Sequence, residues 1–111
     1  MKTDRLENMV RGWFVGAFEP TVLHTSDVEV GIKHYPAGAE ESAHFHKIAT
    51  EITVILEGTA EMNGRTLTAG DIVTLAPGEV ADFRTLTPVT TVVVKHPGAS
   101  DDKYLVETTA P

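Results

Sequence analysis

Short β-branched segments, each closed by a turn signal, follow one another along most of this chain. Residues 50–56 and 89–95 are rich in Val, Ile and Thr, which favour strands. The Asn63-Gly64 pair supplies two residues that tolerate positive φ, as a two-residue hairpin requires. Further strands are expected at residues 13–18, 28–35, 72–75, 80–86 and 104–106. No apolar stripe of helical period follows residue 20, so the pattern predicts an all-β antiparallel sandwich or small barrel.

The length of 111 residues fits a single domain with one hydrophobic core. The polar residues 1–12 predict an N-terminal arm, residues 13–107 the β-barrel, and residues 108–111 a C-terminal tail. No linker, repeat or low-complexity tract indicates a second domain.

The chain is acidic, with a formal net charge of −7 from 9 Lys+Arg and 16 Asp+Glu. No Lys/Arg cluster occurs in the sequence, so neither nucleic acid nor an anionic membrane surface is an expected partner. Cys is absent, which excludes disulfides, thiolate metal sites and Cys nucleophiles. The charged first residues lack the apolar core of a signal peptide, and the apolar stretches are too short to span a bilayer. These features predict a cytoplasmic protein.

The segment His44-Phe45-His46 is the strongest candidate for chemistry. Residues two apart on a strand point to the same face, so both imidazoles can reach one point. Glu51 follows at the start of the next apolar strand, and two imidazoles with one carboxylate are a common ligand set for a divalent transition metal. His-x-His alone often matches a solvated strand face by chance. The added carboxylate favours a metal site, because buried polar groups are costly without a partner.

This segment resembles the first motif of the cupin family. That motif consists of Gly, five residues, His, one residue, His, three or four residues, Glu, six residues and Gly. Gly38, His44, His46, Glu51 and Gly58 occupy its anchors. The resemblance implies a cupin-type antiparallel β-barrel, also called a double-stranded β-helix or jelly roll, formed by a single domain.

The second cupin motif, which begins at Gly70, lacks its usual His. Counting from Gly78 places that position at Ala81, and counting from Pro77 places it at Asp82. Adjacent strand residues face opposite sides, so the two registers make opposite predictions for Asp82. We favour the count from Pro77, because six residues separate Gly70 from Pro77 where five are usual in the family, and counting from Pro77 allows for this insertion. Asp82 is then a fourth metal ligand. The other register leaves Asp82 solvated.

Two carboxylates would shift the preference of the site toward harder metals. Iron or manganese is therefore favoured over copper, with zinc and nickel as alternatives. Thr53 shares the face of Glu51 by strand alternation and is a candidate for the pocket lining. Ile55 and Phe83 are expected as apolar lining, although core packing alone would explain both.

The resemblance implies a metal-dependent enzyme, of dioxygenase or isomerase type, that acts on a small polar organic molecule in the barrel. A non-catalytic module that binds or senses a small ligand or a metal is the alternative. A further alternative is a metal-free cupin similar to sugar-nucleotide isomerases and epimerases, with His46 and Tyr35 as base and acid. A structural role also stays open. Cupins often exchange N-terminal strands, so the aromatic residues 13–18 favour a homodimer.

Overall fold

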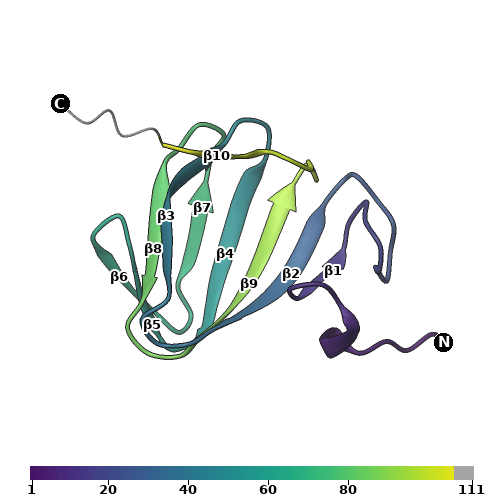
Figure 1. Cartoon of the computed structure of the whole chain (residues 1–111), viewed down its shortest axis with the longest axis horizontal. Helices are drawn as coiled ribbons and strands as arrows, with labels where there is room; N and C mark the ends of the chain where they lie inside the picture. Colours follow the sequence, from purple (N-terminus) through teal and green to yellow (C-terminus); the bar gives the residue numbers. More distant parts are fainter. Residues whose placement is uncertain (107–111) are drawn as a thin grey trace.

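Two antiparallel five-stranded sheets face each other in the computed structural model, which describes residues 1–106 (Figure 1). The sheet orders are β1-β2-β9-β4-β7 and β10-β3-β8-β5-β6. The strands are β1 (Trp13–Val15), β2 (Glu29–Tyr35), β3 (Glu40–His46), β4 (Thr50–Glu57), β5 (Thr59–Met62), β6 (Arg65–Thr68), β7 (Ile72–Leu75), β8 (Ala81–Thr85), β9 (Val89–His96) and β10 (Lys103–Leu105). The all-β antiparallel prediction is confirmed.

The chain before β1 carries a single 3-10 turn, η1 (Leu6–Asn8). The first strand begins at Trp13 and the last ends at Leu105, while the expected tail at residues 108–111 lies outside the described residues. Within residues 1–106, no helix has the length and apolar character needed to cross a membrane.

The predicted Asn63-Gly64 hairpin is confirmed. Asn63 and Gly64 have φ values of 50° and 77°, and Met62 pairs with Arg65 across the turn. Both turn residues therefore adopt the left-handed conformation that a tight hairpin between twisted strands requires.

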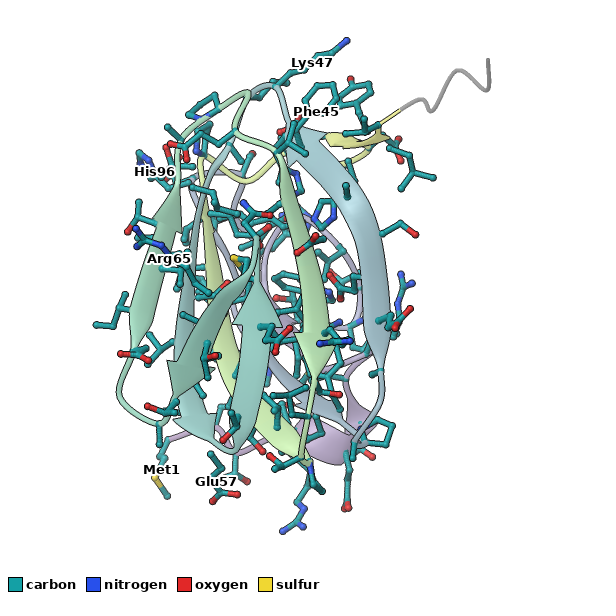
Figure 2. All side chains as sticks on the ribbon, turned by 90° about the vertical axis from the view of Figure 1, so that its left-hand side faces the viewer. Met1, Phe45, Lys47, Glu57, Arg65 and His96 are labelled. Atoms are coloured by element: carbon teal, nitrogen blue, oxygen red, sulfur yellow. The ribbon has the colours of Figure 1, made fainter. Side chains whose placement is uncertain are left out.

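Strand alternation divides the space between the sheets into an apolar and a polar part. The apolar part holds the buried cluster Ile55, Ala60, Met62, Leu67, Ala81, Phe83 and Val89. The polar part holds His44 and His46 of β3, which are among the buried polar residues. Figure 2 shows side chains filling the interior, whereas Lys47, Arg65 and His96 point outward. Apolar side chains therefore pack one part of the barrel interior, and polar side chains line the other part, where a site can form.

The short strand β1 covers the edge of the first sheet by pairing with β2 of the same chain. Trp13 lies against Gly31, where an added Cβ would come within 2.7 Å of the indole ring. Glycine therefore permits this close approach. The homodimer with exchanged N-terminal strands stays a prediction.

Candidate functional site

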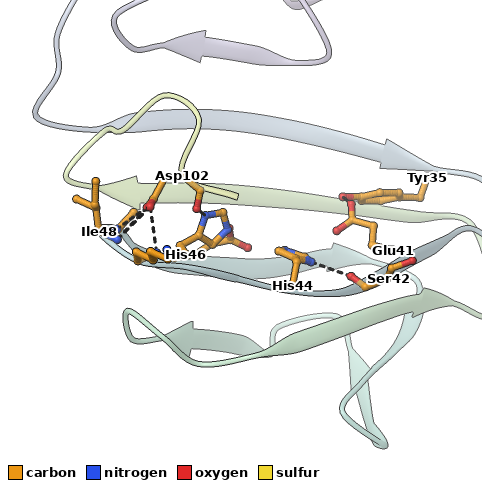
Figure 3. A network of polar contacts seen from close by, with 10 residues as sticks. Tyr35, Glu41, Ser42, His44, His46, Ile48 and Asp102 are labelled. Atoms are coloured by element: carbon orange, nitrogen blue, oxygen red, sulfur yellow. Dashed lines mark hydrogen bonds and ion pairs between the residues drawn. The ribbon is translucent and has the colours of Figure 1, made fainter. Parts of the chain in front are cut away.

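His44 and His46 are held in one orientation by backbone carbonyls (Figure 3). Nδ1 of His44 lies 3.0 Å from the carbonyl oxygen of Ser42, and Nδ1 of His46 lies 2.9 Å from that of Asp102. Because a carbonyl oxygen can only accept, both Nδ1 atoms must donate their N–H. A neutral ring then has its lone pair on Nε2, which is the tautomer that binds metals through Nε2.

Glu51 brings a carboxylate against His46. Its Oε2 lies 2.8 Å from Nε2 of His46, and the Glu51 side chain is only 14% exposed. Within residues 1–106, this Nε2 is nevertheless a buried nitrogen without a hydrogen bond of acceptable geometry. A nitrogen lone pair and a carboxylate at this separation repel each other unless a proton or a metal cation lies with them.

The environment of Glu51 stabilises its ionised form. Burial alone would raise the pKa of Glu51, but the contact with His46 and the charge of Lys95 outweigh it and lower the pKa. The site therefore keeps a buried carboxylate ionised beside two imidazoles.

The donor types and the tautomers fit a divalent transition metal, although no cage is already formed. Among residues 1–106, no three side chains of the metal-binding types are grouped so as to hold an ion. His46 and Glu51 instead contact each other. A metal would therefore have to replace this direct contact.

The structure exposes the Asp82 side chain to solvent, which contradicts the favoured register of the second motif, although Asp82 is among the residues around a small cavity beside His44 and Glu51. Ala81, Phe83 and Thr85 are the buried residues of β8, and Asp82 is exposed between two of them. Its carboxylate accepts a hydrogen bond of 2.8 Å from the backbone N–H of Asn63. The Gly78 count is correct, because Ala81 lies opposite His44 in the β3–β8 ladder. Asp82 is satisfied by the hairpin turn and does not join the other three candidates.

Two hollows adjoin the candidate ligands. The outer cavity, of about 240 Å³, is lined by His44, His46 and Glu51 together with Tyr35 and Glu41. Its other charged lining residues, called the basic rim below, are Arg11, Lys33, Lys95 and Lys103. A larger hollow of about 830 Å³ between the N-terminal arm and β2 contains neither candidate histidine.

The inner cavity, of about 30 Å³, continues from the site toward the core. Thr53 lines it, as strand alternation predicts, and Phe83 lines it as the expected apolar residue. Ile55 is fully buried in the apolar cluster, so core packing explains it. The inner cavity is close to the volume of one water molecule, whereas the outer cavity is about eight times as large.

Tyr35 and Glu41 form a second polar pair in both cavities. The Tyr35 hydroxyl donates to Oε1 of Glu41 at 3.0 Å. Burial and the neighbouring Glu41 carboxylate raise the pKa of Tyr35, so the phenol keeps its proton. The sequence analysis did not identify Glu41, which lies inside the first motif between its Gly and its first His.

Asp102 is the supporting residue that the sequence analysis missed. Its buried carboxylate accepts hydrogen bonds of 2.9 to 3.1 Å from the backbone N–H groups of Lys47, Ile48 and Ala49. Its carbonyl holds the His46 ring. Burial alone would raise the pKa of Asp102, but the three N–H donors outweigh it and lower the pKa. Asp102 therefore links the turn after β3 to the candidate ligand.

No family model matches this chain, and no curated protein matches it. Among solved structures, it is similar to an uncharacterized conserved protein with a double-stranded β-helix domain from Klebsiella pneumoniae subsp. pneumoniae. The identity is 32% and the TM-score 0.67, over 78% of this chain and 81% of the other.

Two further similar structures carry activities in their names. The DMSP lyase DddQ from Ruegeria pomeroyi is 25% identical with a TM-score of 0.70, over 85% of this chain but only 49% of the lyase. A sugar phosphate isomerase of the cupin superfamily from Silicibacter pomeroyi is 24% identical with a TM-score of 0.58, over 64% of this chain and 51% of the isomerase. The isomerase supports the fold alone. Taken with the barrel and the Klebsiella likeness, these findings establish that the chain belongs to the cupin superfamily of double-stranded β-helix proteins.

Proposed function

We propose that this cupin binds a divalent transition metal through His44, His46 and Glu51 and acts on a small polar organic molecule in the outer cavity. One observation carries the proposal: Nε2 of His46 is buried, lacks a well-directed hydrogen bond within residues 1–106, and contacts the Glu51 carboxylate. A divalent cation would satisfy both groups at once.

The reaction we favour is of dioxygenase or isomerase type. When bound, the metal would supply Lewis-acid or redox chemistry at its open coordination positions. The backbone carbonyls that accept from both histidines keep the rings from turning away. The Tyr35 phenol keeps its proton and donates it to Glu41, so its oxygen is left to accept a hydrogen bond from a ligand in the outer cavity.

Two imidazoles and one carboxylate favour iron among the candidate metals, because this is the set of non-haem iron sites. Without Asp82, the second carboxylate that supported manganese is missing from the site. Manganese, zinc and nickel are therefore alternative outcomes of the metal test.

Two alternatives use the same cavity. A binding or sensing module would hold metal and ligand without turnover. Metal-free acid–base chemistry by His46 and Tyr35 has less support, because the hydrogen-bond partner of the Tyr35 hydroxyl is Glu41. The likeness to DMSP lyase DddQ supports an enzyme over a passive module, but it covers only 49% of the lyase.

Metal analysis tests the proposal. We expect protein purified without chelator, or reloaded with ferrous iron, manganese or zinc, to bind about one equivalent per chain, and the His44→Ala, His46→Ala double variant to bind less than about a tenth of that. The matched control is the His24→Ala, His34→Ala double variant, which removes two exposed imidazoles outside the site. Equal metal content in both double variants would overturn the assignment.

A further inference from the structure

The basic rim brings together positively charged side chains that lie far apart in the sequence. Arg11, Lys33, Lys95 and Lys103 are four of the nine Lys and Arg residues of a chain whose formal net charge is −7. They come from the segment before β1, from β2, from β9 and from β10, and all four line the outer cavity. Only the fold brings them to one place.

The rim is held together by aromatic and backbone contacts. Nζ of Lys33 lies 5.2 Å from the centroid of the Trp13 ring, and Nζ of Lys95 lies 5.0 Å from it. Lys33 also donates to the carbonyl of Arg11 at 3.0 Å. The indole thus draws two ammonium groups toward one ring, which like charges would not do on their own.

Carboxylates of the protein do not neutralise this rim. Among residues 1–106, none of the four basic side chains forms an ion pair with Asp or Glu. The two carboxylates of the cavity, Glu41 and Glu51, are hydrogen-bonded to Tyr35 and in contact with His46. With four cations against two anions, the outer cavity has a net charge of about +2 when its histidines are neutral.

The surroundings of Lys33 show the same crowding. Burial and the charge of Arg11 lower the pKa of Lys33, and Lys95 and Lys103 add to the effect while Glu41 opposes it. An anion placed among these groups would relieve their mutual repulsion.

We propose that the outer cavity binds a small organic carboxylate, whose negative group is held by the basic rim beside His44 and Glu51. The proposal names the substrate class of the proposed function. It depends on the proposed function only for the claim that the bound carboxylate reacts, because the basic rim is made of residues of the chain and needs no metal. The volume of about 240 Å³ suits a compact molecule, since it lies below the ~300–1,000 Å³ of drug-sized sites. A singly charged carboxylate is favoured over a doubly charged phosphate, because Glu41 and Glu51 repel added negative charge.

Calorimetric titration with matched probes tests this proposal. The probes are acetate and lactate, their uncharged amides, and methyl phosphate, each added to metal-free and to metal-loaded protein. We expect at least one carboxylate to bind metal-free protein with a Kd below about 10 mM, about ten-fold or more tighter than its amide. Fluorescence of Trp13, the single Trp of the chain, should change with the same Kd because two rim lysines lie near its ring.

Charge-removing variants locate the binding. Lys33→Met and Lys95→Met should each weaken carboxylate binding about ten-fold, because Met keeps most of the side-chain length without the charge. If either of these variants fails to fold, Lys103→Met replaces it in the test, because Lys103 is an exposed residue of β10. Lys47→Met is the matched control, because Nζ of Lys47 lies 4.1 Å from the Tyr104 ring centroid but outside the cavity. Its affinity should equal that of the wild type.

Three results would overturn the carboxylate proposal: equal affinity for acid and amide, tighter binding of methyl phosphate than of every carboxylate, or no carboxylate binding below about 10 mM. Because the decisive titration is the one on metal-free protein, failure of the metal site leaves its outcome unaffected. Conversely, one equivalent of metal without any carboxylate preference would reject the substrate class and retain the metal site.

Discussion

Asp102 supports the site through both its backbone and its side chain. The carbonyl orients His46, and the carboxylate satisfies three backbone N–H groups in the turn between β3 and β4. That turn separates the two histidines from Glu51 in the sequence. The geometry of the candidate ligands therefore depends on a residue that is not itself a candidate ligand.

Replacing Asp102 by Ala should destabilise the protein by about 3 kcal/mol, because three N–H groups lose a charged acceptor in a buried place. Metal affinity should also fall, by about ten-fold or more, as the support of His46 loosens. Urea unfolding and metal titration measure the two effects. Asp101→Asn, at the exposed neighbour, is the control and should change neither. An unaltered unfolding midpoint for Asp102→Ala would contradict this role.

His44, His46 and Glu51 could be identified from the sequence because they lie close together and share a strand period. Asp102 could not, because its partners lie 53 to 56 residues earlier in the chain. The polar residues 99–103 indicate only where the sheet region ends. A contact of this kind follows from sheet order, which strand patterns alone do not specify.

At the level of elements, the strands followed from β-branched composition and the Asn63-Gly64 turn, but the register of β8 did not. Pro77 and Gly78 offer two adjacent anchors, and a shift of one residue exchanges the two faces of a strand. Ala81 and Phe83 determine the outcome because both pack inward, while Asn63 provides Asp82 with a partner outside. Inward packing thus determines which residues of β8 face the interior, and the hydrogen bonds with Asn63 support that register from outside.

The corrected register makes a direct prediction for Asp82. Asp82→Ala should leave the metal content and metal affinity unchanged and should cost less than about 1 kcal/mol, through loss of the exposed bond to Asn63. Glu51→Ala is the comparison, and it should lower the affinity for metal because a ligand is lost. Metal titration of both variants decides the matter. A loss of affinity in Asp82→Ala as large as in Glu51→Ala would restore Asp82 to the site.

The turns that join β4, β5 and β6 differ in how closely they pack. Gly58 and Gly64 both have positive φ, but a Cβ at Gly58 would lie 2.1 Å from the carbonyl oxygen of Pro88, whereas nothing lies within 4 Å of one at Gly64. Gly64→Ala should therefore cost about 1 kcal/mol for its backbone conformation. Gly58→Ala should cost at least about 2 kcal/mol more, because backbone must move. Urea unfolding checks the difference, and equal losses would show that the β4–β5 turn adapts freely.

For the whole molecule, the cupin architecture joins an acidic surface to a cavity of opposite charge. The net charge of −7 correctly describes the chain as a whole but gives no indication of the basic rim, whose four residues are spread from Arg11 to Lys103. The composition therefore predicts weak binding of polyanions such as nucleic acid. It does not predict the positive charge of the cavity. The local field at the cavity, and not the net charge, determines which small molecules gain on entering it.

Metal binding at a buried site should be coupled to the stability of the entire barrel. A metal that binds only the folded chain, supplied at a hundred times its Kd, adds about 2.7 kcal/mol to the free energy of unfolding. For a domain of this size, that corresponds to a rise in Tm of roughly 10 °C. Scanning calorimetry with and without metal measures the shift, and the His44→Ala, His46→Ala double variant should show none.

The same shift should depend on pH, because protons compete with the metal for the two imidazoles. As pH falls, ligation requires neutral rings that are becoming protonated, so Kd rises and the metal-induced gain in Tm shrinks. At a fixed metal concentration, we expect the gain in Tm to be smaller in acid than near neutral pH. The His24→Ala, His34→Ala double variant should show the wild-type pH dependence, since its imidazoles lie outside the site. An undiminished gain in acid would mean that the metal stabilises this cupin through oxygen ligands alone.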